Sequence, residues 1–229
     1  MADPIMVDFE GFANKRPVLA GVLVDGAFQQ FAFVDVEPVI EVAARARRLE
    51  CMEFASFCAE LVGRARRERR GIAGFSTHER DWIASGLGGC WPADVEYIDA
   101  KRCAKAWRSR RHPEAAARVH VDRTRMRQAK ERCRNHGNRL IDFVRLAGIE
   151  VPDDYGDQRV TAALRRVLQQ SSRHTRFGGY AQGVKDAWSA VLRHNRCDCR
   201  WARMFVRWGG SRSQGAGSGR RSSERGTAA

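Results

Sequence analysis

The sequence predicts an α/β protein: a mixed sheet, antiparallel near the N-terminus and extended by parallel strands, is flanked by helices and followed by a helical C-terminal half. Three observations support this fold class. Two β-rich runs surround an Asp-Gly pair, short apolar runs then alternate with segments of helical periodicity, and no convincing strand follows residue 110.

The opening of the chain predicts three strands. PIMVDFEG is a short apolar run with acids at alternate positions, which indicates a strand from about Ile5 to Glu10. The next stretch, RPVLAGVLVDGAFQQFAFVD, places a β-rich run on each side of Asp25-Gly26. Asp-Gly favours a two-residue hairpin because both central positions need positive φ. The second and third strands are therefore expected to pair antiparallel.

The middle of the chain alternates helix and strand. Helical spacing of apolar residues predicts a helix from Val36 to about Arg70, which Gly71 ends. GIAGFS is a brief strand, Thr77 caps a helix that begins at His78, VEYID (95–99) is a further strand, and a basic helix follows over 100–111. Strands separated by helices are expected to join the sheet in parallel.

The C-terminal half is predicted to be helical. HGNRLIDFVRLAG is a helix ended by Gly148, and further helices are expected over 159–170, 181–193 and from Asn195 to about Arg207. Residues 209–229 are a low-complexity run of Gly, Ser and Arg, for which disorder is expected. The sequence therefore predicts one domain over 1–208 and a disordered basic tail over 209–229.

The charge of the chain favours a polyanionic partner. The formal net charge is +14, but residues 1–60 carry ten acids against five bases and are net −5, so the remainder is +19. An acidic opening before a basic body suits a carboxylate site that faces a phosphate backbone. Nucleic acid is the expected partner, and an anionic membrane surface is the second possibility.

Other features of the sequence narrow the class of protein. No apolar run approaches the roughly 20 residues that a membrane span needs. No secretory signal precedes the seven cysteines, so reduced thiols and a cytoplasmic location are expected. Cys133-x-x-His136 and Cys197-x-Cys199 are isolated half-motifs without the second pair of ligands that zinc requires.

Asp8 and Glu10 are the first candidate site residues. They lie two apart on a predicted strand, so their side chains leave the same face. Adjacent carboxylates repel each other, and a bound Mg²⁺ or Mn²⁺ neutralises such a pair with its preferred oxygen ligands. The alternative is a chance Asp-x-Glu pair on the surface.

Two further segments supply candidates. His194 and Asp198 are four apart on a predicted helix and share a face, where a histidine deprotonates water while an aspartate binds metal. The alternative is an ordinary surface or capping pair. Glu79 follows a predicted strand, where functional groups are often presented, and Asp81 lies on roughly the opposite side of its helix, so only one of the two is expected at a site.

These segments together resemble the DEDD-type 3′–5′ exonucleases of the ribonuclease H-like superfamily, and in particular the predicted ribonuclease H-like nuclease branch. The matching motifs, in order, are Asp8-Phe9-Glu10, Phe75-Ser76-Thr77-His78-Glu79 and His194-Asn195-Arg196-Cys197-Asp198, and the resemblance covers about residues 4–208.

The resemblance implies a two-metal phosphodiesterase. Asp8, Glu10, Glu79 and Asp198 would hold two Mg²⁺ or Mn²⁺ ions, and His194 stands where the family places its general base. Two positions depart from the family pattern. The second motif usually supplies aspartate rather than glutamate, and tyrosine more often stands four residues before the last aspartate.

Three hypotheses follow. The first is a metal-dependent nuclease that hydrolyses DNA or RNA, and the second is a catalytically decayed nucleic-acid-binding module on the same fold. The third is a basic scaffold or interaction protein, in which the acids are only surface residues. Only the first two explain the acids and the basic body together.

Overall fold

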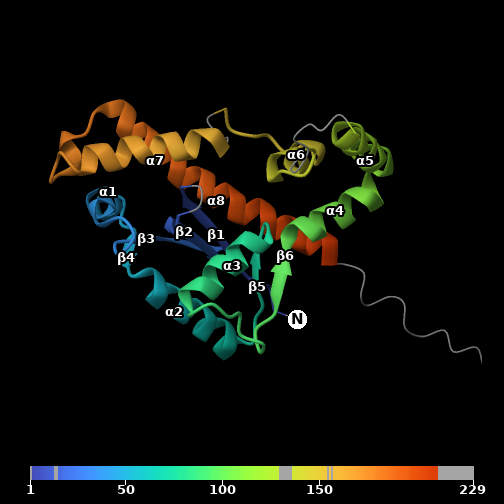
Figure 1. The fold of residues 1–229 in the computed structure, drawn as a ribbon, viewed down its shortest axis with the longest axis horizontal. Helices are drawn as coiled ribbons and strands as arrows, with labels where there is room; N and C mark the ends of the chain where they lie inside the picture. The colour runs from blue at the N-terminus through green and yellow to red at the C-terminus, as the bar shows by residue number, and fades with distance from the viewer. Residues whose placement is uncertain (1, 13–14, 129–135, 154, 156, 211–229) are drawn as a thin grey trace, which may run out of the picture.

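The sheet of the computed structural model has six strands in the order β4-β3-β2-β1-β5-β6 (Figure 1). The structure describes residues 2–12, 15–128, 136–153, 155 and 157–210. The strands are β1 (Ile5–Gly11), β2 (Pro17–Val24), β3 (Ala27–Phe33), β4 (Glu50–Met52), β5 (Ile72–Gly74) and β6 (Tyr97–Asp99).

The sheet is mixed, which confirms the predicted fold class. β1, β2 and β3 pair antiparallel. β4 runs parallel to β3, β5 parallel to β1, and β6 parallel to β5. The hairpin prediction is also confirmed, because Asp25 (φ 50°) and Gly26 (φ 92°) both adopt the positive φ of the expected turn.

Helices cover the sheet and form most of the C-terminal half. The α-helices are α1 (Glu41–Ala46), α2 (Phe54–Glu68), α3 (Thr77–Gly86), α4 (Ala100–Arg111), α5 (Pro113–Gln128), α6 (Leu140–Leu146), α7 (Asp157–Ser171) and α8 (Gln182–Gly210), with 3₁₀ turns η1 (Pro38–Ile40) and η2 (Phe177–Gly179). Among the described residues, none of the helices is long and apolar enough to cross a membrane.

The prediction of one helix from Val36 to Arg70 is wrong. The first helix, α1, ends at Ala46, and Arg48 then takes a positive φ of 59°. Residues 50–52 form β4 by pairing with the edge of β3. The backbone N–H and C=O groups of this segment form their hydrogen bonds with the edge of β3 instead of within a helix. Helical periodicity of the apolar residues does not reveal such a pairing. The second helix, α2, ends at Glu68 with Arg69 in the left-handed conformation, before the predicted stop at Gly71.

The start of α3 and the extent of α8 also differ from the prediction. Ser76, rather than Thr77, caps α3, because its hydroxyl accepts the backbone N–H of His78. The two helices predicted over 181–193 and 195–207 form the single helix α8, since no Gly or Pro interrupts the run after Gly183. Of the predicted tail, only Gly209 and Gly210 lie inside the described residues, and Cys133 also lies outside them.

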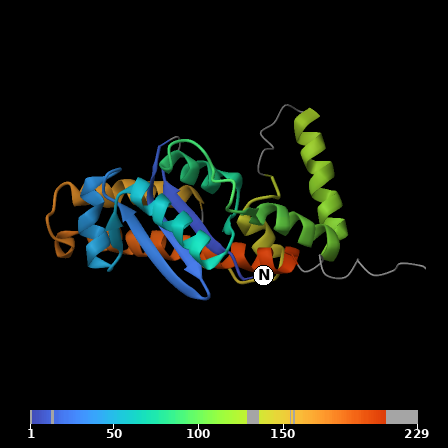
Figure 2. The same cartoon turned by 90° about the horizontal axis from the view of Figure 1, so that it is seen from below.

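The sheet is sandwiched between two helical layers, with α2 and α3 on one face and α8 on the other (Figure 2). Ile5 and Val7 of β1 pack in the same core cluster as α2. Met6, between them, packs with Cys199 and Ala202 of α8. The alternation of β1 therefore points even-numbered residues, including Asp8 and Glu10, toward α8.

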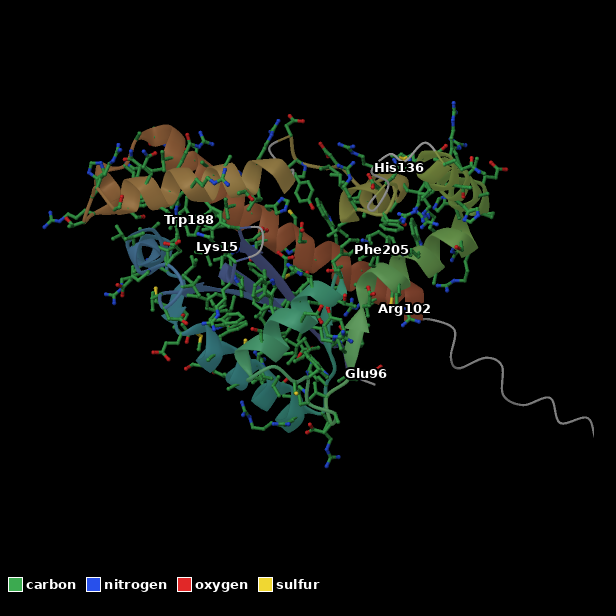
Figure 3. The ribbon with its side chains drawn as sticks, viewed as in Figure 1. Lys15, Glu96, Arg102, His136, Trp188 and Phe205 are labelled. Atoms are coloured by element: carbon green, nitrogen blue, oxygen red, sulfur yellow. The ribbon has the colours of Figure 1, made fainter. Side chains whose placement is uncertain are left out.

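Helix α8 is held at both ends by buried aromatic side chains (Figure 3). Trp188 is fully buried and donates its indole N–H to the carbonyl oxygen of Ala43, 3.1 Å away. Phe205, also fully buried, packs its ring edge-on against Phe143 of α6 at 5.8 Å. These anchors fix the helix rotation and hence the face that it turns toward the sheet.

Candidate active site

The structure brings acids and a histidine together between β1 and α8. Asp8 and Glu10 are 8% and 9% exposed, and His194 of α8 is 6% exposed. His194 Nε2 lies 3.6 Å from Glu10 Oε1 and 3.6 Å from Asp198 Oδ2. The imidazole therefore stands between a carboxylate of the first strand and a carboxylate of the last helix, rather than on the open surface.

Asn195 holds the fourth group, Asp8. This asparagine is fully buried, and its Nδ2 donates to Asp8 Oδ2 at 2.7 Å and to the Asp8 carbonyl oxygen at 3.0 Å. Its Oδ1 accepts a hydrogen bond from Gln30 Nε2 at 3.0 Å. The amide thus joins β1 to β3 and fixes the orientation of the Asp8 carboxylate.

Gly21 makes room for this amide. In the sheet register, Gly21 of β2 is the partner of both Asp8 and Gln30. A Cβ at Gly21 would lie 2.2 Å from Asn195 Oδ1, far inside contact distance. The absence of a side chain at this one strand position allows the Asn195 side chain to span β2.

Tyr155, which precedes α7, completes the cluster from another direction. Its hydroxyl donates to Asp198 Oδ1 at 2.6 Å, and its ring stacks on the His194 imidazole at 4.2 Å with an interplanar angle of 23°. A short O–H···O⁻ bond of this kind holds a carboxylate firmly. Tyr155 therefore positions the aspartate and the imidazole at the same time.

Glu79 reaches the buried side of α3 but is engaged locally. Its Oε2 accepts from the backbone N–H and the hydroxyl of Ser76, both at 3.0 Å, which forms a capping box at the helix start. Glu79 is 8% exposed, and burial raises the pKa of its carboxyl. The side chain of Asp81 is 61% exposed and paired with Arg80, so Glu79 is the acid of this segment that turns inward.

The four acids act on one another electrostatically. Burial raises the pKa of Asp8 well above its usual range, and the charges of Glu10, Asp198 and Glu79 raise that pKa further. The hydrogen bond from Asn195 opposes the shift by stabilising the charged form. Acids from three distant parts of the chain thus lie near enough to affect a single carboxyl group.

The donor chemistry of this cluster suits a hard divalent cation. Carboxylate oxygens are the ligands that Mg²⁺ and Mn²⁺ prefer, and a cation would relieve the repulsion that raises the pKa of Asp8. Over the residues that the structure describes, however, no three His, Cys, Asp or Glu side chains are already arranged to hold an ion. In this arrangement His194 lies close to the carboxylates of Glu10 and Asp198, and Asn195 donates to that of Asp8.

Sequence reasoning missed Tyr155 and gave Asn195 no role. Tyr155 lies between helices, where no periodicity predicts its neighbours. The role of Asn195 could have been predicted from its position. It lies four residues from both Val191 and Cys199 in the apolar stripe of α8, and a buried amide there needs hydrogen-bond partners.

The fold and the cluster define the chain as an α/β protein with a buried acid–histidine site on the α8 face of its sheet. Comparison with protein-family models, with curated proteins and with solved structures found no match for this chain.

Proposed function

We propose that this protein is a metal-dependent nuclease that hydrolyses phosphodiester bonds of DNA or RNA. The observation that carries the proposal is that Glu10 and Asp198 both lie 3.6 Å from His194 and both act electrostatically on the buried Asp8. The resemblance to DEDD-type exonucleases of the ribonuclease H-like superfamily adds the 3′–5′ direction. We also propose a cytoplasmic location. It agrees with the six cysteines in the described part of the chain, which are all free thiols.

The proposal includes two Mg²⁺ or Mn²⁺ ions. Asp8, Glu10 and Asp198 would hold them together with Glu79, which would have to release part of its capping bond to Ser76. Such ions, when bound, activate water and stabilise negative charge on a leaving oxygen.

The residues of the chain provide the remaining chemistry. His194 is the one imidazole in the cluster and would accept the proton of the attacking water as general base. The carboxylates of Glu10 and Asp198, each 3.6 Å away, would stabilise the imidazolium that results. Tyr155 keeps the ring in place by stacking, and Asn195 keeps the Asp8 carboxylate in place by hydrogen bonding.

The basic body of the chain supports a nucleic-acid substrate. The net charge of +14 attracts a polyanion. The acids of the site would repel a bound phosphate unless a cation neutralised their charge. This division of charge along the sequence suits a nucleic-acid strand that is bound at a carboxylate site.

A specific observation favours the alternative, a nucleic-acid-binding module without catalysis. Glu79 satisfies the capping box of α3, and His194 already bridges two carboxylates. A protein that had lost catalysis would retain such contacts for stability alone.

A nuclease assay separates the two functions. End-labelled single-stranded and duplex DNA and RNA are incubated with the full-length chain in Mn²⁺ or in EDTA. We expect cleavage in Mn²⁺ only, and His194→Ala to reduce the rate by about 100-fold or more, the usual contribution of a general base. Asp8→Ala and Asp198→Ala are expected to abolish cleavage.

The control is Asp81→Ala, which removes an exposed acid of the same protein. Cleavage that persists in EDTA, or in Asp8→Ala, would contradict the metal-dependent site. Tight binding of the same oligonucleotides without cleavage by the wild-type chain would favour the binding module.

A further inference from the structure

A hollow separate from the acid–histidine cluster lies at the β3–β4 edge of the sheet. It encloses about 230 Å³ and is lined by side chains of β3, of the turn between α1 and β4, and of α8. The lining residues that matter to its chemistry are Phe28, Gln30, Arg47, Arg48, Glu50 and Arg196.

Three arginines reach this hollow from two elements. Arg47 and Arg48 follow α1, and the positive φ of Arg48 (59°) turns the chain back toward β4. Arg196 comes from α8, where its guanidinium lies 5.0 Å from the centre of the Phe28 ring. Arg47 is held in place by a 2.8 Å hydrogen bond to Ser189 Oγ and by the ring of Phe177.

The positive charge of the hollow is not balanced. Among the residues described by the structure, no carboxylate lies within ion-pair distance of Arg47, Arg48 or Arg196. Glu50 also lines the hollow, so its charged side chains sum to +2. Guanidinium groups that outnumber the acids of a shared hollow favour binding of an anion there.

We propose that this hollow is a binding pocket for a phosphate monoester. Guanidinium forks bind phosphate oxygens in pairs, and a net charge of +2 matches a phosphate monoester dianion better than the single charge of a backbone diester. The volume of about 230 Å³ is below the roughly 300 Å³ at which pockets for larger organic ligands begin, which suits a terminal phosphate group.

Hydrogen bonds connect the pocket to the acid–histidine cluster. Gln30 lines the pocket and donates to Asn195, which in turn donates to Asp8.

Phosphate binding in this pocket is independent of nuclease activity. The phosphate group could come from three sources: inorganic phosphate, a nucleoside 5′-monophosphate, or the 5′-phosphate of an oligonucleotide.

The experiment is calorimetric titration of the full-length chain in EDTA, so that cation-dependent binding at the acids does not contribute. The ligands are inorganic phosphate, a nucleoside 5′-monophosphate, a 5′-phosphorylated trinucleotide and the same trinucleotide with a 5′-hydroxyl. We expect the 5′-phosphate to tighten trinucleotide binding about tenfold or more, the usual effect of charged hydrogen bonds. We expect Arg48→Ala and Arg196→Ala each to remove most of that gain and Arg48→Lys to retain part of it.

Matched controls lie on α8 and on α1, the helix that precedes Arg48. Arg45→Ala on α1 and Arg200→Ala on α8 each remove an arginine outside the hollow and should leave phosphate binding unchanged. Thermal unfolding checks that each variant is folded. Binding of all phosphate ligands would assign the pocket to the phosphate group itself, and binding of the phosphorylated trinucleotide alone would assign it to a nucleic-acid end.

Three results would overturn the proposal: equal affinity for the 5′-phosphorylated and 5′-hydroxyl trinucleotides, equal losses in the control variants, or no binding of any phosphate ligand. Because Asp8→Ala should abolish cleavage and leave phosphate binding in EDTA intact, failure of the nuclease proposal and failure of this one are distinguishable.

Discussion

At the scale of single residues, Asp8 is a carboxyl group that the fold makes costly to ionise. It is buried between β1 and α8, and three other acids act on it. A group whose pKa is raised in the folded state binds more protons there than in the unfolded chain. Its contribution to stability is therefore lost as pH rises from its unfolded pKa of 3.8 through the raised folded pKa.

Asp8→Asn should stabilise the metal-free protein. The amide keeps an oxygen that accepts from Asn195 but carries no charge, so we expect the free energy of unfolding to increase at neutral pH. Chemical denaturation in EDTA at pH 7 and pH 4 measures it, and the gain should shrink at pH 4. Adding Mn²⁺ should stabilise the wild type and not the variant. A variant less stable than the wild type in EDTA at pH 7 would contradict this account.

The amide of Asn195 depends on the bare backbone of Gly21. Gly21→Ala would place a Cβ 2.2 Å from Asn195 Oδ1, so we expect a loss of about 1–3 kcal/mol of folding free energy, typical of overpacking. Gly183→Ala is the control, because a Cβ there meets nothing within 4 Å. Urea denaturation of both variants makes the comparison, and equal stabilities would show that Asn195 moves without cost.

The candidate site was predictable to the extent that it lies in regular structure. Asp8 and Glu10 share a face because strands alternate, and His194 and Asp198 share a face because helices turn every 3.6 residues. Tyr155 is not part of a repeating element, and its position depends on how the chain returns from α6 to α7. No local pattern contains that information.

At the scale of elements, the N-terminus is tied to the end of α8. The Asp3 carboxylate accepts from Arg203 at 2.6 Å and also pairs with Arg207. Hydrogen bonds from Arg207 and Arg203 lower the pKa of Asp3 to about 2. Because the folded pKa is depressed, this stabilisation is present above pH 3.8 and is lost as pH falls toward 2.

Asp3→Asn should therefore destabilise the protein at neutral pH and have little effect near pH 2. The loss should be under about 1 kcal/mol, since the pair is partly exposed to water. Denaturation curves of the wild type and the variant at several pH values test this, with Asp81→Asn as an exposed control. A difference that stays constant down to pH 2 would indicate a role other than this ion pair.

The elements that sequence predicted well are those that local chemistry determines. The Asp25-Gly26 turn fixes the hairpin, and the basic helix over 100–111 was predicted with the bounds that the structure shows for α4. β4 was missed because only its pairing with β3 makes residues 50–52 a strand. Short edge strands of this kind are determined by tertiary contact rather than by propensity.

At the scale of the whole molecule, the net charge of +14 governs the approach of a polyanion. We expect binding of a single-stranded oligonucleotide to weaken by more than about tenfold between 50 and 200 mM salt, because bound phosphates release counterions. Fluorescence anisotropy in EDTA measures this, and Asp8→Ala should show the same slope. Affinity independent of salt would contradict a phosphate-backbone partner.

Helix α8 also constrains how this protein can change over evolution. It carries His194, Asn195 and Asp198 of the site, Arg196 of the phosphate pocket and Arg203 of the N-terminal tie on one uninterrupted helix. Inserting one residue near its start would rotate every later side chain by about 100° relative to the anchored end. Insertions and deletions should therefore be excluded between Trp188 and Arg203, even though many single substitutions on the exposed face of α8 remain tolerable.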